Sequence, residues 1–267
     1  MTVTRIEKSN PKYARPKTMT LTLQSSHLNR RQDVTIYNAY SANKDLPIVL
    51  LLHGVYGNSW VWMDSGGAHL VYETLRAQGL EEFVLVMPSD GGLWEGSGYL
   101  PLGDNGDYDQ WIMQDVLSAV QTSVDCVSEK SKQYISGLSM GGYGALRLGT
   151  KYASQFSGIS AHSSITQVSD LALFTDTPLS HYQTEDDNEG NIIHWCEKNR
   201  DALPPLRLDC GEDDELFESN QHLVQTLNQH DIPHEYHIFA GGHEWEYWHE
   251  HLADTLTFFN KIQTKGI

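Results

Sequence analysis

A G-x-S-x-G pentapeptide at residues 137–141 constrains this chain more than any other feature. Residues 134–136 have the pattern of a strand end, and residues 142–148 that of a helix start. A serine at such a junction forms a nucleophile elbow, where a tight turn strains the serine backbone and the flanking glycines keep side chains out of the strand–helix crossing. The motif predicts that Ser139 is a nucleophile rather than a structural turn serine, and that the chain adopts an α/β-hydrolase fold.

The rest of the chain alternates strand and helix patterns, which predicts a mostly parallel, doubly wound sheet. Continuous apolar runs are typical of strands covered on both faces, whereas period-two alternation indicates strands with one buried face. By these criteria residues 47–52 form a central strand, and residues 19–23 and 34–37 form two antiparallel edge strands at the N-terminal side. Further strands are expected at 83–87, 132–136, 158–161, 206–210 and 234–239, and helices at 68–78, 108–124, 192–198, 215–229 and 245–261.

The length of 267 residues suits a single α/β domain spanning residues 1–267. Regularity weakens between residues 162 and 204, a segment too small to carry its own core. We interpret it as an inserted lid. Residues 89–107 form a long glycine-rich loop, and loops of this length in compact domains are usually functional or mobile.

Charge and composition exclude several classes of partner. The chain has 18 Lys and Arg against 35 Asp and Glu, a net charge of −17, which argues against binding to nucleic acid or to anionic membranes. No apolar run is long enough to span a membrane, and residues 1–20 lack the apolar core of a secretory signal. Three widely spaced cysteines suit reduced thiols, so we expect a cytoplasmic protein. The sequence leaves open whether it forms a homo-oligomer.

A serine nucleophile needs a base within hydrogen-bond reach and a carboxylate to orient that base, and in α/β-hydrolases these follow the serine in the order acid, then histidine. His243 follows two glycines after the last expected strand and is the expected base. The acid falls in the run Gly-Glu-Asp-Asp-Glu at 211–215. By position alone, Asp213 and Asp214 are equally suitable as the carboxylate that orients His243.

The negative oxygen of a tetrahedral intermediate needs N–H donors. Position predicts one donor at Met140, directly after the nucleophile, and the other at Val55, in the loop after the strand 47–52. We expect Gly54 and Trp94 to contact the substrate, and Trp60, Trp62 and Tyr99 are further aromatics whose alternative role is loop packing. No histidine pair forms the H-E-x-x-H zinc motif, and His230 and His234, which are spaced H-x-x-x-H, fall at turn or strand positions, so no metal is expected.

Four segments together resemble the esterase D family of serine esterases, which includes S-formylglutathione hydrolases, tributyrin-type esterases, feruloyl esterases and mycolyltransferases. They are LLHGVYGN at 51–58, GLSMGGYGA at 137–145, GEDD at 211–214 and GHEWEYW at 242–248. The resemblance covers residue 48 to the C-terminus, apart from the lid. It implies that the acid is Asp214, that Val55 and Met140 are the oxyanion donors, and that no cofactor is used. Leu138 stands where S-formylglutathione hydrolases usually carry a histidine. The loop at 53–58 also differs from theirs and is more similar to that of the tributyrin-type esterases.

The sequence therefore predicts a carboxylesterase that hydrolyses short-chain acyl esters of small molecules through an acyl-enzyme. Alternatives within the same chemistry are an S-formylglutathione hydrolase or other thioesterase, and a feruloyl or acetyl-sugar esterase. The alternative outside enzymes is a binding protein on a hydrolase scaffold. Such proteins typically lose a member of the triad, and here all three candidates are present.

Overall fold

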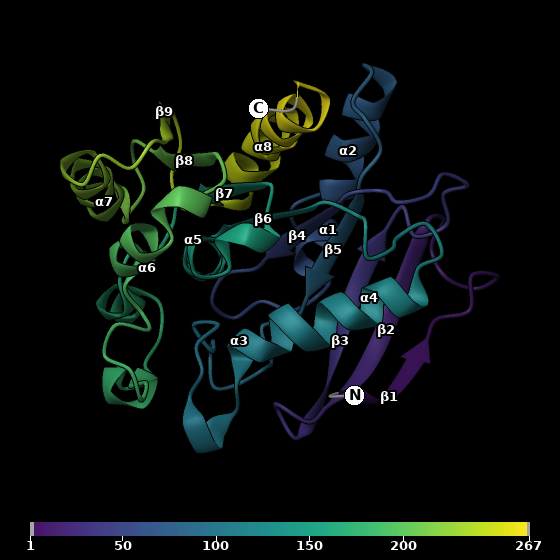
Figure 1. The fold of residues 1–267 in the computed structure, drawn as a ribbon, viewed down its shortest axis with the longest axis horizontal. Coiled ribbons are helices and arrows are strands. Elements are labelled where there is room, and N and C mark those ends of the chain that lie inside the picture. The colour runs from purple at the N-terminus through teal and green to yellow at the C-terminus, as the bar shows by residue number, and fades with distance from the viewer. Residues whose placement is uncertain (1–2, 266–267) are drawn as a thin grey trace.

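The computed structural model describes residues 3–265. Within this range nine strands form one sheet in the order β1-β2-β3-β5-β4-β6-β7-β8-β9 (Figure 1). The strands are β1 (Val3–Lys8), β2 (Thr18–Ser25), β3 (Arg30–Tyr37), β4 (Ile48–Leu52), β5 (Val84–Pro88), β6 (Gln133–Leu138), β7 (Gly158–His162), β8 (Leu206–Gly211) and β9 (Glu235–Phe239).

The sheet is antiparallel at its N-terminal side and parallel over the rest. β1, β2, β3 and β5 pair antiparallel, and all pairs from β5 through β4 to β9 are parallel. This is the predicted mostly parallel, doubly wound architecture. The sequence did not predict β1, which pairs with β2 and is the outermost strand. Only Val3 and Ile6 of β1 are even half-buried, so the strand lacks the apolar alternation by which β2 and β3 were recognised.

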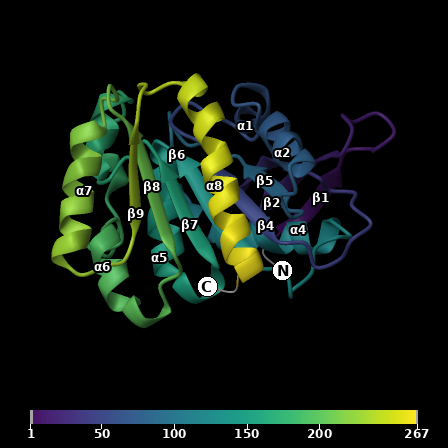
Figure 2. The same cartoon turned by 90° about the horizontal axis from the view of Figure 1, so that it is seen from above.

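Helices cover both faces of the sheet. On one face lie α1 (Val61–Asp64), α2 (Ala68–Ala77) and α8 (Trp245–Lys265), and Figure 2 shows α8 lying across the parallel strands with α1 and α2 beside it. The other face packs against α3 (Tyr108–Gln110), a π-helical stretch at Trp111–Val116, α4 (Leu117–Ser123), α5 (Met140–Lys151), α6 (Ile192–Lys198) and α7 (Phe217–Gln229).

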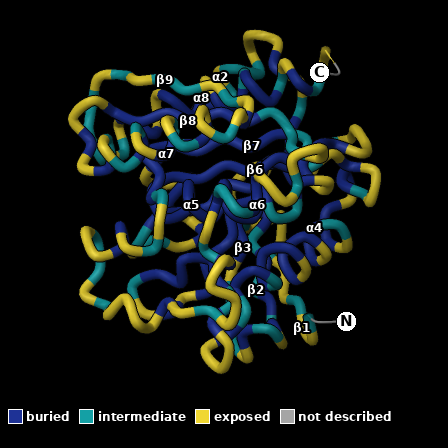
Figure 3. Tube along the Cα trace, turned by 60° about the vertical axis from the view of Figure 1, so that its left-hand side comes forward, coloured by how far each residue is buried: buried dark blue, intermediate teal, exposed yellow. Residues whose placement is uncertain are grey.

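The central strand β4 shows why both faces must be covered. Ile48, Leu50 and Leu52 belong to the core on the α5 side, whereas Val49 and Leu51 belong to the core under α2 and α8. All five are fully buried, and Figure 3 shows the same burial along the neighbouring strands. Side chains of a strand point alternately to opposite faces, so a continuous apolar run needs a helical layer on each side.

The segment from 162 to 204 connects the parallel strands β7 and β8. Its helix α6 has the predicted bounds and packs on α5 through the buried Trp195 and Cys196. Arg147 of α5 is fully buried and forms ion pairs with Asp109 of α3 and with Glu189 of this segment. The predicted single domain begins and ends at residues 1–2 and 266–267, which lie outside the described residues.

None of the helices between residues 3 and 265 combines the length and the apolarity that crossing a lipid bilayer requires. Cys126, Cys196 and Cys210 are free thiols buried in the core, which is the packing role expected for them.

Candidate active site

Ser139 lies at the predicted elbow between β6 and α5. Its backbone has φ +54° and ψ −122°, a region that residues other than glycine rarely adopt. Two glycines of the motif are required because a Cβ atom at either position would clash with a neighbouring backbone carbonyl group. A Cβ on Gly137 would lie 2.1 Å from the Gly141 carbonyl oxygen, and a Cβ on Gly141 would lie 2.2 Å from the Leu52 carbonyl oxygen.

Neighbouring segments hold this strained turn in place. The Ser139 N–H donates to the carbonyl oxygen of His162 at 3.0 Å, and the Ile165 N–H donates to the Ser139 carbonyl oxygen at 3.2 Å. Both partners lie just after or at the end of β7, beside the elbow. The serine is buried, with 3% of its surface exposed, so its hydroxyl sits at the bottom of a pocket rather than on an open surface.

His243 and Asp214 complete the predicted constellation. The Nε2 atom of His243 lies 3.0 Å from the Oγ atom of Ser139. Its Nδ1 atom lies 3.0 Å from each carboxylate oxygen of Asp214. The three residues follow β6, β8 and β9, whose carboxyl ends meet at one edge of the parallel sheet. This is the geometry in which an imidazole accepts a serine proton while a carboxylate orients it.

The structure separates the two aspartates that position alone could not. Asp214 is buried and bonds to His243, whereas the side chain of Asp213 is exposed to solvent. Burial by itself would raise the pKa of Asp214, but hydrogen bonding and the charge of His243 outweigh it. The Leu216 N–H, which donates to Asp214 at 2.8 Å, adds to this effect, and the net pKa is lowered. A carboxylate at this position therefore stays ionised.

Two aromatic rings enclose His243. Phe174 stacks on the imidazole with ring centroids 4.7 Å apart, and Trp248 meets it edge-on at 4.9 Å. The segment GHEWEYW contains Trp248, so sequence could associate it with the site. Phe174 lies in the irregular segment 162–204, 69 positions before His243, and no local pattern marks it.

Of the two residues expected to bind an oxyanion, Met140 directly follows Ser139, and Val55 lines the same pocket as Ser139. Gly54 packs so closely on the nucleophile that a Cβ there would lie 3.1 Å from the Ser139 Cβ. Neither the Val55 nor the Met140 N–H donates to another described residue. His53 holds the loop, because its Nδ1 donates to the Gly54 carbonyl oxygen at 2.8 Å and its Nε2 accepts from the Asp90 N–H at 2.9 Å. Among the described residues, the Ser139 hydroxyl bonds to His243 and not to His53.

A pocket of about 640 Å³ opens above Ser139. Gly54 lines it, as expected, but Trp94 does not and instead packs against His181 and Tyr182. Trp62 and Tyr99 are buried and donate to main-chain carbonyls, so they are packing residues. The pocket is lined by residues of the loop after β4, of α1 and its flanks, of the elbow, of the segment 162–204, and of the loop before α8 and its first turn, namely Gly54, Val55, Tyr56, Gly57, Trp60, Val61, Ser65, Leu138, Ser139, Phe174, His243, Glu244, Trp245 and Trp248.

Between residues 3 and 265, one group of potential metal ligands brings three donors together, namely Asp214, Glu215 and His243. Two of these donors already bond to each other, and Glu215 is exposed. The set therefore fits the orientation of an imidazole better than the coordination of an ion, whose ligands must point their lone pairs at a common centre.

A family model described as "Putative esterase" matches residues 25–259. An acetyl esterase of Caldicellulosiruptor saccharolyticus is 26% identical over 237 residues, which are 82% of this chain and 85% of that protein. A solved ferulic acid esterase superposes with a TM-score of 0.79 at 26% identity, over 92% of this chain and 98% of that one. The fluorophosphonate-binding serine hydrolase F of Staphylococcus aureus superposes with a TM-score of 0.77 at 19% identity, over 91% and 98% of the two chains. These likenesses confirm the predicted α/β-hydrolase fold.

Proposed function

The chain belongs to the putative esterase family and is a serine ester hydrolase. We propose that it cleaves short-chain carboxylic esters with Ser139, His243 and Asp214. The observation that carries the proposal is the unbroken hydrogen-bonded chain from the Ser139 hydroxyl through the His243 imidazole to the buried Asp214 carboxylate. It also argues against the alternative of a binding protein on a hydrolase scaffold.

The geometry defines the role of each group. The Oγ of Ser139 attacks the acyl carbon while Nε2 of His243 accepts the hydroxyl proton, and Asp214 stabilises the imidazolium that forms. The N–H groups of Val55 and Met140 bind the carbonyl oxygen as it becomes negative. Collapse of the intermediate breaks the ester C–O bond, and His243 returns its proton to the departing alcohol. Water, activated by the same histidine, then attacks the acyl-enzyme and releases the acid.

The size and lining of the pocket support small esters as substrates. Its volume of about 640 Å³ suits a small ligand, and the related acetyl esterase is named for the smallest common acyl group. A second candidate is an ester of an aromatic acid. It is favoured by the aromatic lining of Trp60, Phe174, Trp245 and Trp248, and by the likeness to a ferulic acid esterase.

We propose that the segment 162–204 acts as a lid over this pocket. Its Phe174 lines the pocket, and the following turn is held by Glu95 of the long loop 89–107. The Glu95 carboxylate accepts from the Thr175 hydroxyl, from the Asp176 N–H at 2.8 Å and from the Thr177 N–H at 3.2 Å. The Glu95 carbonyl oxygen accepts from the Tyr56 N–H at 2.8 Å, which connects the lid to the loop that carries Val55.

The cytoplasmic location expected from the sequence stays a proposal. It is supported by the three buried free thiols, because oxidising compartments favour disulfides.

The test is hydrolysis of p-nitrophenyl esters from acetate to decanoate, with Ser139→Ala as the matched control. We expect activity to peak at short acyl chains and to be lost in the variant. Undiminished turnover by Ser139→Ala would refute the assignment of the nucleophile. Turnover of matched thioesters well above that of the oxygen esters would identify a thioesterase instead. Preference for methyl ferulate over acetate esters would select the second candidate.

A further inference from the structure

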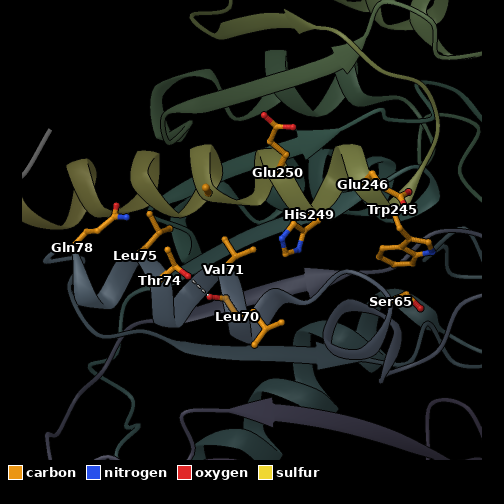
Figure 4. Close-up of a pocket in the computed structure, with 11 residues that line it drawn as sticks. Ser65, Leu70, Val71, Thr74, Leu75, Gln78, Trp245, Glu246, His249 and Glu250 are labelled. Carbon is orange, nitrogen blue, oxygen red and sulfur yellow. Dashed lines mark hydrogen bonds between the residues drawn. The ribbon is translucent and has the colours of Figure 1, made fainter.

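The pocket above Ser139 adjoins a second hollow. Ser65 and Trp245 line this pocket and also a groove of about 730 Å³ between α2 and α8. Figure 4 shows these two residues together at one end of the groove and Gln78 at the other. Along the groove runs α2, whose 10 residues Ala68–Ala77 span roughly 15 Å at 1.5 Å per residue.

Two glycines let the helices approach each other where the groove meets the pocket. A Cβ on Gly66 would lie 3.0 Å from the ring of Trp245, and a Cβ on Gly67 would lie 3.0 Å from Nδ1 of His249. The same Nδ1 lies 2.8 Å from the Gly66 carbonyl oxygen. Trp245 is therefore held between the two hollows, with one side toward the candidate catalytic pocket and the other toward the groove.

The position of the groove relative to His243 indicates which half of an ester it can receive. His243 gives its proton to the leaving group, so the alcohol oxygen must lie beside its Nε2 atom. Trp248 packs edge-on against His243, and Trp245 packs edge-on against Trp248 with ring centroids 5.2 Å apart. These packed rings connect His243, which protonates the alcohol, to Trp245 at the end of the groove. On this ground the groove is assigned to the alcohol rather than to the acyl group.

The groove walls select the chemistry of that alcohol. Leu70, Val71 and Leu75 of α2 face Ala253 of α8, and Leu70 keeps 58% of its surface exposed although it is a large apolar residue. Glu246 and Glu250 lie on the α8 side, in a chain whose net charge is −17. Apolar walls with carboxylates beside them favour a neutral, elongated alcohol over an anionic one.

We propose that the α2–α8 groove is a leaving-group subsite, and that the preferred substrates are short-acyl esters of elongated, neutral, largely apolar alcohols. This inference rests on the proposed esterase function and adds the identity of the alcohol. Trp245 is then a specificity-determining residue at the passage between the two compartments.

The test uses two ester series. In one, the acyl group is acetyl and the primary alcohol lengthens from ethanol to octanol. In the other, the leaving group is p-nitrophenol and the acyl chain lengthens. A fully buried methylene contributes about fourfold to a binding constant, and an open groove covers each methylene in part. We expect kcat/KM to rise about tenfold between butyl and octyl acetate, with no such rise in the acyl series.

A matched pair of variants locates the effect. Thr74→Trp places a large ring in the groove, whereas Ala77→Trp places the same ring on an exposed position of α2 outside it. We expect Thr74→Trp to abolish the dependence on alcohol length and Ala77→Trp to preserve it, with Tm showing that both variants fold. Thr74→Trp and Ala77→Trp behaving alike, or no dependence on alcohol length in the wild type, would overturn the proposal.

A length dependence confined to the acyl series and lost in Thr74→Trp would also overturn it, because the groove would then hold the acyl chain. In each of these cases hydrolysis of p-nitrophenyl acetate, absent in Ser139→Ala, shows that the esterase function still holds. Absence of all ester hydrolysis would instead refute the proposed function and the groove inference together.

Discussion

Replacing Asp214 by asparagine removes the negative charge that the structure places against His243. The carboxylate oxygens lie 3.0 Å from Nδ1, with Asp214 buried and His243 largely enclosed. At an effective dielectric constant of about 20, a charge pair at this distance interacts by about 5 kcal/mol. In the proposed mechanism, that interaction stabilises the imidazolium formed in the transition state and is absent before proton transfer. An energy of this size corresponds to a fall in kcat/KM of roughly 10³ to 10⁴.

The assay is the initial rate of p-nitrophenyl acetate hydrolysis, with Ser139→Ala defining the background and Tm confirming that the variants fold. Asp213→Asn is the matched control, because Asp213 is the adjacent aspartate and its side chain is exposed. We expect Asp213→Asn to stay within about twofold of the wild type, since substitutions at exposed positions away from special features have small effects. Equal losses in the two variants, or a larger loss in Asp213→Asn, would refute the assignment of the orienting acid.

Three further predictions follow from other contacts. Asp209, fully buried against His162 and Arg207, has a pKa lowered to about 2, because its interactions with these two side chains outweigh the opposing effect of burial. Asp209→Asn should therefore lower the free energy of unfolding by about 3 kcal/mol at pH 7. In urea unfolding, the difference from the wild type should shrink as the pH falls from 4 toward 2. A difference that does not change with pH would contradict this prediction. Gly141→Ala should lower the free energy of unfolding by about 3 kcal/mol, because its Cβ would lie 2.2 Å from the Leu52 carbonyl oxygen. Gly142→Ala is the control, since the nearest atoms to its Cβ are those of Ser164 at 3.0 Å or more. Thermal unfolding should show a smaller loss of stability for Gly142→Ala. Glu95→Ala should lower kcat/KM on the order of 10- to 100-fold, with little change in Tm. Glu95→Gln keeps an acceptor oxygen and should retain most of the wild-type kcat/KM. Equal activity of the two variants would argue against the proposed lid contact.

Much of the fold was predictable because its signals are local. The apolar run of β4 predicts a strand covered on both faces, and the short helix expected at 192–198 matches the bounds of α6. Strand β1 was not predicted, because it is an edge strand with few apolar residues. It is stabilised by its hydrogen bonds to β2, which no sequence pattern within β1 indicates.

The candidate site divides in the same way. Ser139 and His243 were found from short motifs, whereas the residues alone could not distinguish Asp213 from Asp214, and the family resemblance was needed. Tertiary structure separates them by burial, since only Asp214 turns inward toward His243. The same holds for the aromatic side chains. Trp94 was expected at the substrate but packs on Tyr182, and Phe174, which carried no signal, stacks on His243.

The sequence by itself determined that this is a serine hydrolase, because a strained elbow needs glycines at positions 137 and 141. That requirement produces a short motif that can be recognised in the sequence. Only the tertiary structure decided what surrounds that chemistry. The contacts of Glu95 with residues 175–177, the aromatic enclosure of His243 and the groove beyond Trp245 all join segments far apart in the chain. Contacts of this kind depend on how the helices pack on the sheet, and no periodicity within one segment encodes them.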